Sequence, residues 1–120
     1  MASGLENLKI YQLAKKLEKF IYLITNYFPT DEKFAKISQM RRSSASVADN
    51  IAESYGKFSF KAKINSLYIA RGEAYEIRHQ IDSVTEKYID IKLSEWLADQ
   101  YTQEIKCING FIRYLKSKSN

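Results

Sequence analysis

The feature that most constrains this chain is a spacing of three and four residues between apolar positions, repeated over four long segments. Such spacing places apolar side chains on one face of an α-helix. The segments are residues 5–28, 30–55, 59–88 and 94–116. The chain has 120 residues but only one proline and four glycines, too few turn-forming residues for an all-β fold. The sequence therefore predicts an all-α protein.

The boundaries of the segments carry their own signals. Pro29 ends the first helix, because the residue before a proline disfavours α geometry. Thr30 is predicted to cap the second helix, with Asp31 and Glu32 in its first turn, where carboxylates complement the helix dipole. Gly56 is predicted as the left-handed residue that ends this helix. The third helix is expected to begin near Ser59 and the fourth near residue 94.

Short connections make neighbouring helices antiparallel, so we expect an up-down-up-down antiparallel four-helix bundle. We expect residues 1–4 to form a disordered lead-in and residues 5–117 a single domain. In the first segment a second apolar line makes the apolar face wider than one bundle seam requires. The predicted inward positions are Ile10, Leu13, Ala14, Leu17, Phe20, Ile21, Ile24, Tyr27, Phe28, Ile37, Met40, Ser44, Val47, Ile51, Tyr55, Ile64, Leu67, Ala70, Ala74, Ile77, Ile81, Val84, Tyr88, Leu97, Tyr101, Ile105, Ile108, Ile112 and Leu115.

The residue types needed for catalysis or metal binding are scarce. Cys107 is the only cysteine and His79 the only histidine, which excludes an intramolecular disulfide, a cysteine-based zinc site and a di-iron bundle site. We expect no enzyme activity, no metal and no cofactor, with Cys107 at the edge of the core. Glu95, Asp99 and Glu104 are expected to form a solvated face. The chain shows no secretion signal and no membrane span, so we expect a cytoplasmic protein.

The net charge of +5 is unevenly distributed. Residues 33–63 hold seven basic and two acidic residues, whereas residues 73–104 hold three basic and eight acidic ones. Such a molecule can steer an anionic partner or orient copies of itself. Phe58 and Phe60 lie among the lysines and could stack on bases or plug the end of the bundle. The predicted nucleic-acid-binding residues are Lys33, Lys36, Arg41, Lys57, Lys61 and Lys63, with Arg113, Lys116 and Lys118 as a second patch.

A second polar pattern lies on the second segment, where small serines and alanines also favour a tight helix seam. Four polar residues are spaced four, four and three apart and therefore share a helix face. Polar groups next to core positions are costly unless they are hydrogen-bonded, so we expect them to bond to the third segment, with Glu53 or Glu76 as acceptors. Ordinary surface charges are the alternative. The predicted network comprises Arg42, Ser46, Asn50, Glu53, Arg71 and Glu76.

The same stretch carries a resemblance to a known family. "SQMRRSSASVADNIAESYGK", together with "LKIYQLAKKL", "FPTDEK" and "IARGEAYEIRHQI", resembles bacterial four-helix-bundle proteins first noted in intervening sequences of 23S ribosomal RNA genes. The resemblance covers residues 5–115. It departs at Ser54, where the family usually has glycine, and Gly56 is expected to take over the role of that glycine in ending the helix.

The resemblance implies a ring-like homo-oligomer, commonly a pentamer. It also implies a relationship to the accessory variability determinant of diversity-generating retroelements, which binds nucleic acid and a reverse transcriptase. The nine tyrosines and the wide apolar face of the first segment independently favour assembly. We therefore expect a nucleic-acid-binding oligomer, with RNA, DNA and a reverse transcriptase as candidate partners. The alternatives are a protein-interaction scaffold that does not bind nucleic acid and a small-molecule carrier.

Overall fold

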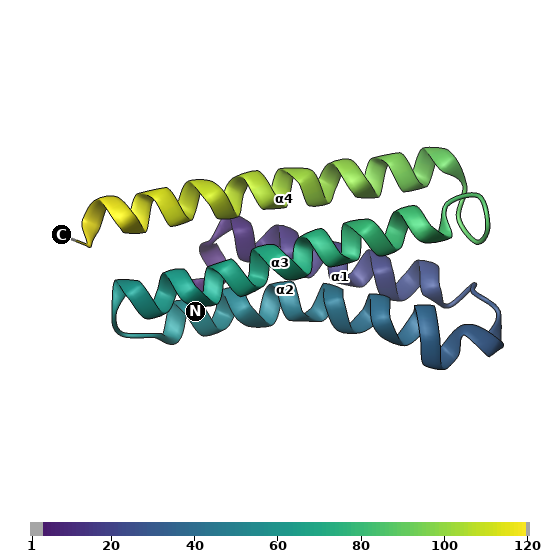
Figure 1. Ribbon diagram of the computed structural model, residues 1–120, viewed down its shortest axis with the longest axis horizontal. Coiled ribbons are helices and arrows are strands. Elements are labelled where there is room, and N and C mark those ends of the chain that lie inside the picture. The colour runs from purple at the N-terminus through teal and green to yellow at the C-terminus, as the bar shows by residue number, and fades with distance from the viewer. Residues whose placement is uncertain (1–3, 120) are drawn as a thin grey trace.

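The computed structural model describes residues 4–119, which fold into a bundle of four long α-helices (Figure 1). Each helix runs antiparallel to the next, in a molecule of 49 × 25 × 24 Å. The predicted all-α, up-down-up-down bundle is confirmed. The predicted lead-in falls, apart from Gly4, outside the described residues. The long helices are α1 (Lys9–Thr25), α2 (Ser38–Gly56), α3 (Phe60–Val84) and α4 (Ile91–Lys118), and a single 3-10 turn, η1 (Leu5–Asn7), precedes them.

The second helical segment begins with two turns that are not α-helical. They are a 3-10 turn, η2 (Thr30–Glu32), and a π-helical turn, η3 (Lys33–Ile37). The prediction that Thr30 caps the helix is wrong, since Pro29 occupies the capping position with ψ near 145° and no side chain caps the turn. Glu32 instead accepts a hydrogen bond of 2.6 Å from the Tyr88 hydroxyl. This bond ties the start of the second segment to the loop between α3 and α4.

Side chains fix the starts of α3 and α4. Ser59 accepts the Ala62 N–H at 3.1 Å, as expected for a residue at a helix start. The Asp90 carboxylate accepts two backbone N–H groups, at 2.6 and 3.2 Å, so α4 begins three residues before the predicted start. The third helix ends at Val84 rather than Tyr88, because Glu86 adopts a left-handed φ of 66° and turns the chain.

The end of α2 differs from its prediction. Gly56 is the last helical residue, and none of the glycines among residues 4–119 has a positive φ. The ammonium of Lys63 instead donates to the carbonyls of Ser54 and Tyr55, at 3.3 and 3.1 Å. Because an amine from the next helix satisfies these terminal carbonyls, the chain leaves α2 without a left-handed residue.

The core follows the predicted inward positions closely. Every predicted position between Ile64 and Val84, and every one in α4, is buried. Tyr27 and Tyr55 are wrong predictions, at 88% and 47% exposed, because they lie at helix ends beyond the last core layer. Tyr88 is half-buried and packs against Phe28, with ring centroids 5.0 Å apart.

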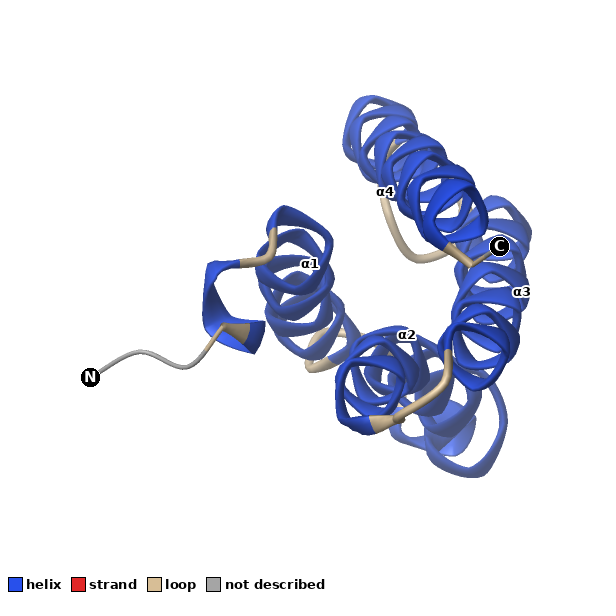
Figure 2. Cartoon of the chain, turned by 90° about the vertical axis from the view of Figure 1, so that its left-hand side faces the viewer, coloured by secondary structure: helices blue, strands red, loops and turns tan. Residues whose placement is uncertain are grey.

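The four helix pairs do not pack equally. The α2–α3 contact is the most extensive, and α1 and α4 make the least contact among neighbouring helices; Figure 2 shows these two spread apart. An edge-to-face contact of Phe20 with Trp96, at 5.1 Å, joins α1 to α4. Small side chains with at most 1% exposure line α2 and α3, namely Ser43, Ser44, Ala48, Ala70 and Ala74.

Candidate nucleic-acid interface

The antiparallel arrangement gathers most of the predicted basic residues at one end of the bundle. The end of α2, the start of α3 and the end of α4 lie together there, at the left of Figure 1. Residues 57–72 and 105–119 contain eight lysines and arginines and no acidic residue. We call this region the basic end. Six of the predicted residues belong to it: Lys57, Lys61, Lys63, Arg113, Lys116 and Lys118.

The cations of the basic end differ in how firmly they are held. Lys57 pairs with Glu53 one turn earlier at 3.3 Å, and both side chains are exposed. Lys63 is bound to the carbonyls at the end of α2. Lys116 and Lys118 lie over tyrosine rings, at 5.6 and 5.7 Å from the ring centroids. Arg71 donates to Asn109 at 2.8 Å. The remaining side chains, Lys61, Lys106 and Arg113, are exposed and form no ion pair within residues 4–119.

A shallow pocket of about 420 Å³ lies within the basic end. It lies between the start of α3 and Ser119, the residue that follows α4. Its wall combines an aromatic ring, a cation, an amide and hydroxyl groups. The lining residues are Ser59, Phe60, Lys61, Ile64, Asn65 and Ser119.

The other three predicted basic residues lie at the opposite end of the bundle. Lys33 is exposed beside Phe34, and Lys36 donates to the Ser83 hydroxyl at 3.0 Å. Residues 82–99 at that end hold five acidic and two basic residues. The first predicted patch is therefore divided between the two ends of the bundle. Its members Lys57, Lys61 and Lys63 lie with the second patch, which is on α4.

Arg41 is held by α1. Its guanidinium donates to the Thr25 hydroxyl and the Asn26 side chain, both at 2.9 Å, and to the Tyr22 carbonyl at 3.4 Å. It also lies 4.5 Å from the centroid of the Tyr22 ring. Thr25 is itself buried. This geometry makes Arg41 a structural link between α2 and α1.

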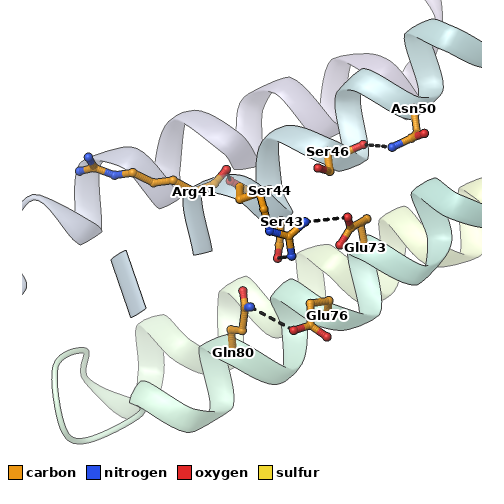
Figure 3. Close-up of polar contacts among 9 residues, drawn as sticks. Arg41, Ser43, Ser44, Ser46, Asn50, Glu73, Glu76 and Gln80 are labelled. Atoms are coloured by element: carbon orange, nitrogen blue, oxygen red, sulfur yellow. Dashed lines mark hydrogen bonds and ion pairs between the residues drawn. The ribbon is translucent and has the colours of Figure 1, made fainter. Parts of the chain in front are cut away.

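The adjacent arginine points to the other neighbouring helix. Arg42 donates to Glu73 on α3 at 3.0 Å and to Ser43 at 3.2 Å (Figure 3). Arg71 donates to Asn109 on α4 at 2.8 Å. The polar contacts therefore link α2 to α3 and α3 to α4 as two separate pairs.

The predicted acceptors of the polar network are not used. Asn50 donates to the Ser46 carbonyl within α2, and Glu76 accepts from Gln80 (Figure 3). Glu53 pairs with Lys57. Among residues 4–119, neither Glu53 nor Glu76 bonds to an arginine. The reason is rotational position, since Glu73 lies on the side of α3 that faces α2 whereas Glu53 and Glu76 are exposed.

The prediction that Glu104 lies on a solvated face is wrong. Glu104 is completely buried, and neither of its carboxylate oxygens has a hydrogen-bond partner among the described residues. Burial raises the pKa of Glu104 to about 8. Burial, with the Glu104 and Glu18 carboxylates, raises the pKa of the neighbouring Tyr101 phenol. The three–four spacing Tyr101, Glu104, Ile108 was the available signal that this carboxyl faces inward.

The remaining chemical groups do not assemble into a site. Cys107 and His79 are both exposed, which corrects the prediction that Cys107 lies at the edge of the core. Within residues 4–119 no three His, Cys, Asp or Glu side chains are grouped so that they could hold a metal ion. None of the described helices is apolar over a length sufficient to cross a bilayer.

Apolar side chains remain exposed on the outer face of α1. Tyr22 and Leu23 are 47% and 59% exposed. A pocket of about 450 Å³ on this helix is lined mainly by the apolar side chains and alkyl stems of Tyr11, Lys15, Lys16, Lys19, Phe20 and Leu23, with Glu6 and Gln12. Exposed apolar area of this kind is typical of an interface.

Comparison with known proteins identifies relatives of the whole bundle. A family model described as 23S rRNA-intervening sequence protein matches residues 6–110. The crystal structure of a protein of unknown function from the S23 ribosomal protein family of Bacteroides thetaiotaomicron is similar, with a TM-score of 0.80 and 24% sequence identity. The alignment covers 87% of this chain and 95% of that one, and at this identity it shows a shared fold. No curated protein matches the chain.

Replacing Arg41 tests its structural role. We expect Arg41→Ala to lower the free energy of unfolding by about 1–3 kcal/mol, because the buried Thr25 hydroxyl and the α1 terminus lose their bonds. Arg41→Lys should recover only part of the loss, since an ammonium cannot reproduce the guanidinium fork. Urea unfolding followed by circular dichroism measures both. The control is Arg113→Ala, an exposed arginine, for which a change below about 0.5 kcal/mol is expected; equal effects at the two positions would contradict the assignment.

The buried carboxyl predicts how stability varies with pH. The folded state holds the Glu104 proton more tightly than the unfolded state, whose pKa is near 4.5. The contribution of Glu104 to the free energy of unfolding is therefore most favourable below pH 4.5. It is lost as the pH rises towards 8, by at most ~1.4 kcal/mol per pH unit. Glu104→Gln should remove this dependence and be more stable than the wild type at pH 8, by on the order of 3 kcal/mol.

Unfolding curves across this pH window, with the exposed Glu95→Gln as control, provide the measurement. Parallel pH profiles for the wild type and Glu104→Gln would show that the carboxyl is not buried in solution.

Proposed function

This chain belongs to the 23S rRNA-intervening sequence protein family, and we propose that it is a non-enzymatic homo-oligomer that binds nucleic acid through its basic end. The observation that carries the proposal is the segregation of charge. Eight cations and no carboxylate occur in residues 57–72 and 105–119, which meet at one end. The bound partner is RNA or DNA, contacted mainly through its phosphates.

Few of these cations are neutralised by a carboxylate, since Lys57 with Glu53 is the only ion pair among them within residues 4–119. Lys63 satisfies the carbonyls at the end of α2, and Lys116 and Lys118 lie in the last turn of α4, where cations complement the helix dipole. Lys61, near the start of α3, opposes the dipole of that helix and does not help it to fold. Phosphate contacts release condensed counterions, so each cation that reaches a phosphate adds to affinity and to its salt dependence. The opposite end carries carboxylates beside Lys33, Lys36 and Arg41, so the excess of cations at the basic end is what orients the molecule as a polyanion approaches.

Assembly supplies the second part of the proposal. The exposed apolar side chains on α1 are suited to contacts between copies of the chain. A ring would present several basic ends to one polyanion and multiply a weak contact by avidity. The pentamer is the stoichiometry that the family resemblance implies, and a reverse transcriptase is the protein partner implied in the same way.

A protein-interaction scaffold is the second candidate function. It is favoured by exposed aromatic rings at the end opposite the basic end, where Tyr27 and Phe34 are 88% and 89% exposed. A scaffold would capture a protein partner with little dependence on salt and would bind free nucleic acid poorly. Salt dependence therefore distinguishes the two functions.

A charge-matched pair of variants tests nucleic-acid binding. We expect the triple variant Lys61→Gln, Lys116→Gln, Lys118→Gln to weaken binding to a fluorescein-labelled RNA hairpin and to reduce the salt slope by about 0.7–0.9 for each lost phosphate contact. Fluorescence anisotropy at a series of salt concentrations is the measurement. The triple variant Lys33→Gln, Lys87→Gln, Lys92→Gln carries the same charge change at the other end and should retain the wild-type slope. Lack of wild-type binding at low salt would exclude the proposal and favour the scaffold.

Light scattering tests the assembly. We expect several copies per particle for the wild type and a smaller particle for Leu23→Glu, because a buried unpaired carboxylate is costly at an interface. Ile69→Glu, at a comparably exposed apolar position on α3, should retain the wild-type mass. A monomeric wild-type protein at micromolar concentration would exclude the oligomer.

A further inference from the structure

One aromatic ring at the basic end has no role in the fold. Phe58 is fully exposed, whereas Phe20 and Phe28 pack against other aromatic rings. It lies in the connection between α2 and α3, and burial of a phenylalanine typically contributes about 1.5–3 kcal/mol. The protein gains none of this from Phe58, so folding does not explain a phenylalanine at this position.

The backbone that carries this ring is held on both sides. Lys57 donates its N–H to the Ser54 carbonyl at 3.3 Å and continues in an extended conformation. Ser59 caps α3 through its hydroxyl, and its carbonyl accepts the Lys63 N–H at 3.0 Å. The connection therefore presents the ring from a defined position, and little backbone ordering is required when a ligand binds.

The surroundings of the ring combine cations with a recess. Lys57 and Lys61 flank it in sequence, and the 420 Å³ pocket begins at the next residue, Ser59. The Asn65 amide in that pocket is exposed and can donate and accept hydrogen bonds. An exposed aromatic ring, two lysines and a polar recess therefore lie within a few residues of one another at the basic end.

We propose that the basic end is a binding site for single-stranded nucleic acid, in which an unpaired base stacks on Phe58 while the lysines hold the adjacent phosphates. This inference rests on the proposed function and specifies the class of nucleic acid. Stacking requires a base with a free π-face, which single strands offer and duplexes hide within the helix. A duplex would engage the same lysines through phosphates alone and would gain nothing from Phe58.

An anionic membrane is the other partner suited to lysines beside an exposed phenylalanine. The pocket favours nucleic acid, because the amide and hydroxyl groups of Asn65, Ser59 and Ser119 can pair with the edge of a base next to the stacked one. A lipid surface would leave this recess without a role. Vesicle binding is therefore included as an outcome of the test.

The test compares variants at Phe58 on single-stranded and duplex probes. We expect Phe58→Ala to weaken binding of a fluorescein-labelled oligothymidylate by about 5-fold to 150-fold, the range measured for loss of one stacked base. Binding of a duplex of the same length should be unchanged. Phe58→Trp should retain single-strand affinity and Phe58→Leu should lose it, because leucine is apolar but cannot stack.

Phe34→Ala provides the matched control. Phe34 is also highly exposed and lies beside a lysine, with Lys33 5.6 Å from its ring centroid, but at the opposite end of the bundle. Its removal should leave affinity for both probes unchanged. Light scattering of Phe58→Ala should give the wild-type mass; dissociation would show that the ring contacts another copy and would overturn the inference.

The outcomes separate this inference from the proposed function. Equal losses on single-stranded and duplex probes, or no loss with Phe58→Ala, would overturn the stacking site while leaving nucleic-acid binding intact. No binding to either probe would overturn both. Binding to phosphatidylglycerol–phosphatidylcholine vesicles without oligothymidylate binding would replace the proposal with a membrane surface.

Discussion

Close approach of α2 and α3 through small side chains is the constraint on which this structure depends. Buried serines and alanines allow the backbones of α2 and α3 to come close, and these two helices make the most extensive contact in the bundle. The arginine pair at the start of α2 then fixes its neighbours, since Arg41 bonds to α1 and Arg42 to α3. One short stretch of sequence therefore positions three of the four helices, which explains why it combines small residues with fixed cations.

The opposite side of the bundle is less completely satisfied. On α4, the buried carboxyl of Glu104 and the Tyr101 hydroxyl have no hydrogen-bond partners among residues 4–119. A buried carboxyl of this kind lowers stability at neutral pH. On the outer surface, α1 exposes Tyr22 and Leu23. The molecule thus has a closely packed pair of helices, α2 with α3. The outer face of α1, in contrast, is suited to contact with another molecule.

Most of the fold could be predicted from periodicity, because burial of one face requires only the spacing of apolar residues. Local capping was predicted less well. The predicted cap at Thr30 was wrong because Pro29 occupies the capping position. The predicted left-handed Gly56 was wrong because the Lys63 ammonium, from the next helix, bonds to the carbonyls at the end of α2. The candidate cations were identified by charge, but Lys33 was predicted in the same patch as Lys61. The elements that carry them, η3 and the start of α3, lie at opposite ends of the bundle.

The sequence by itself determined the helices, their inward faces and the amount of charge on each segment, since these depend on residues three and four positions apart. Only the tertiary structure decided which charges meet. Antiparallel packing brings residues 57–72 beside residues 105–119, and helix rotation selects Glu73 rather than Glu53 as the partner of Arg42. The reason is that electrostatic and hydrogen-bond partners are chosen by distances between helices, which no local spacing specifies.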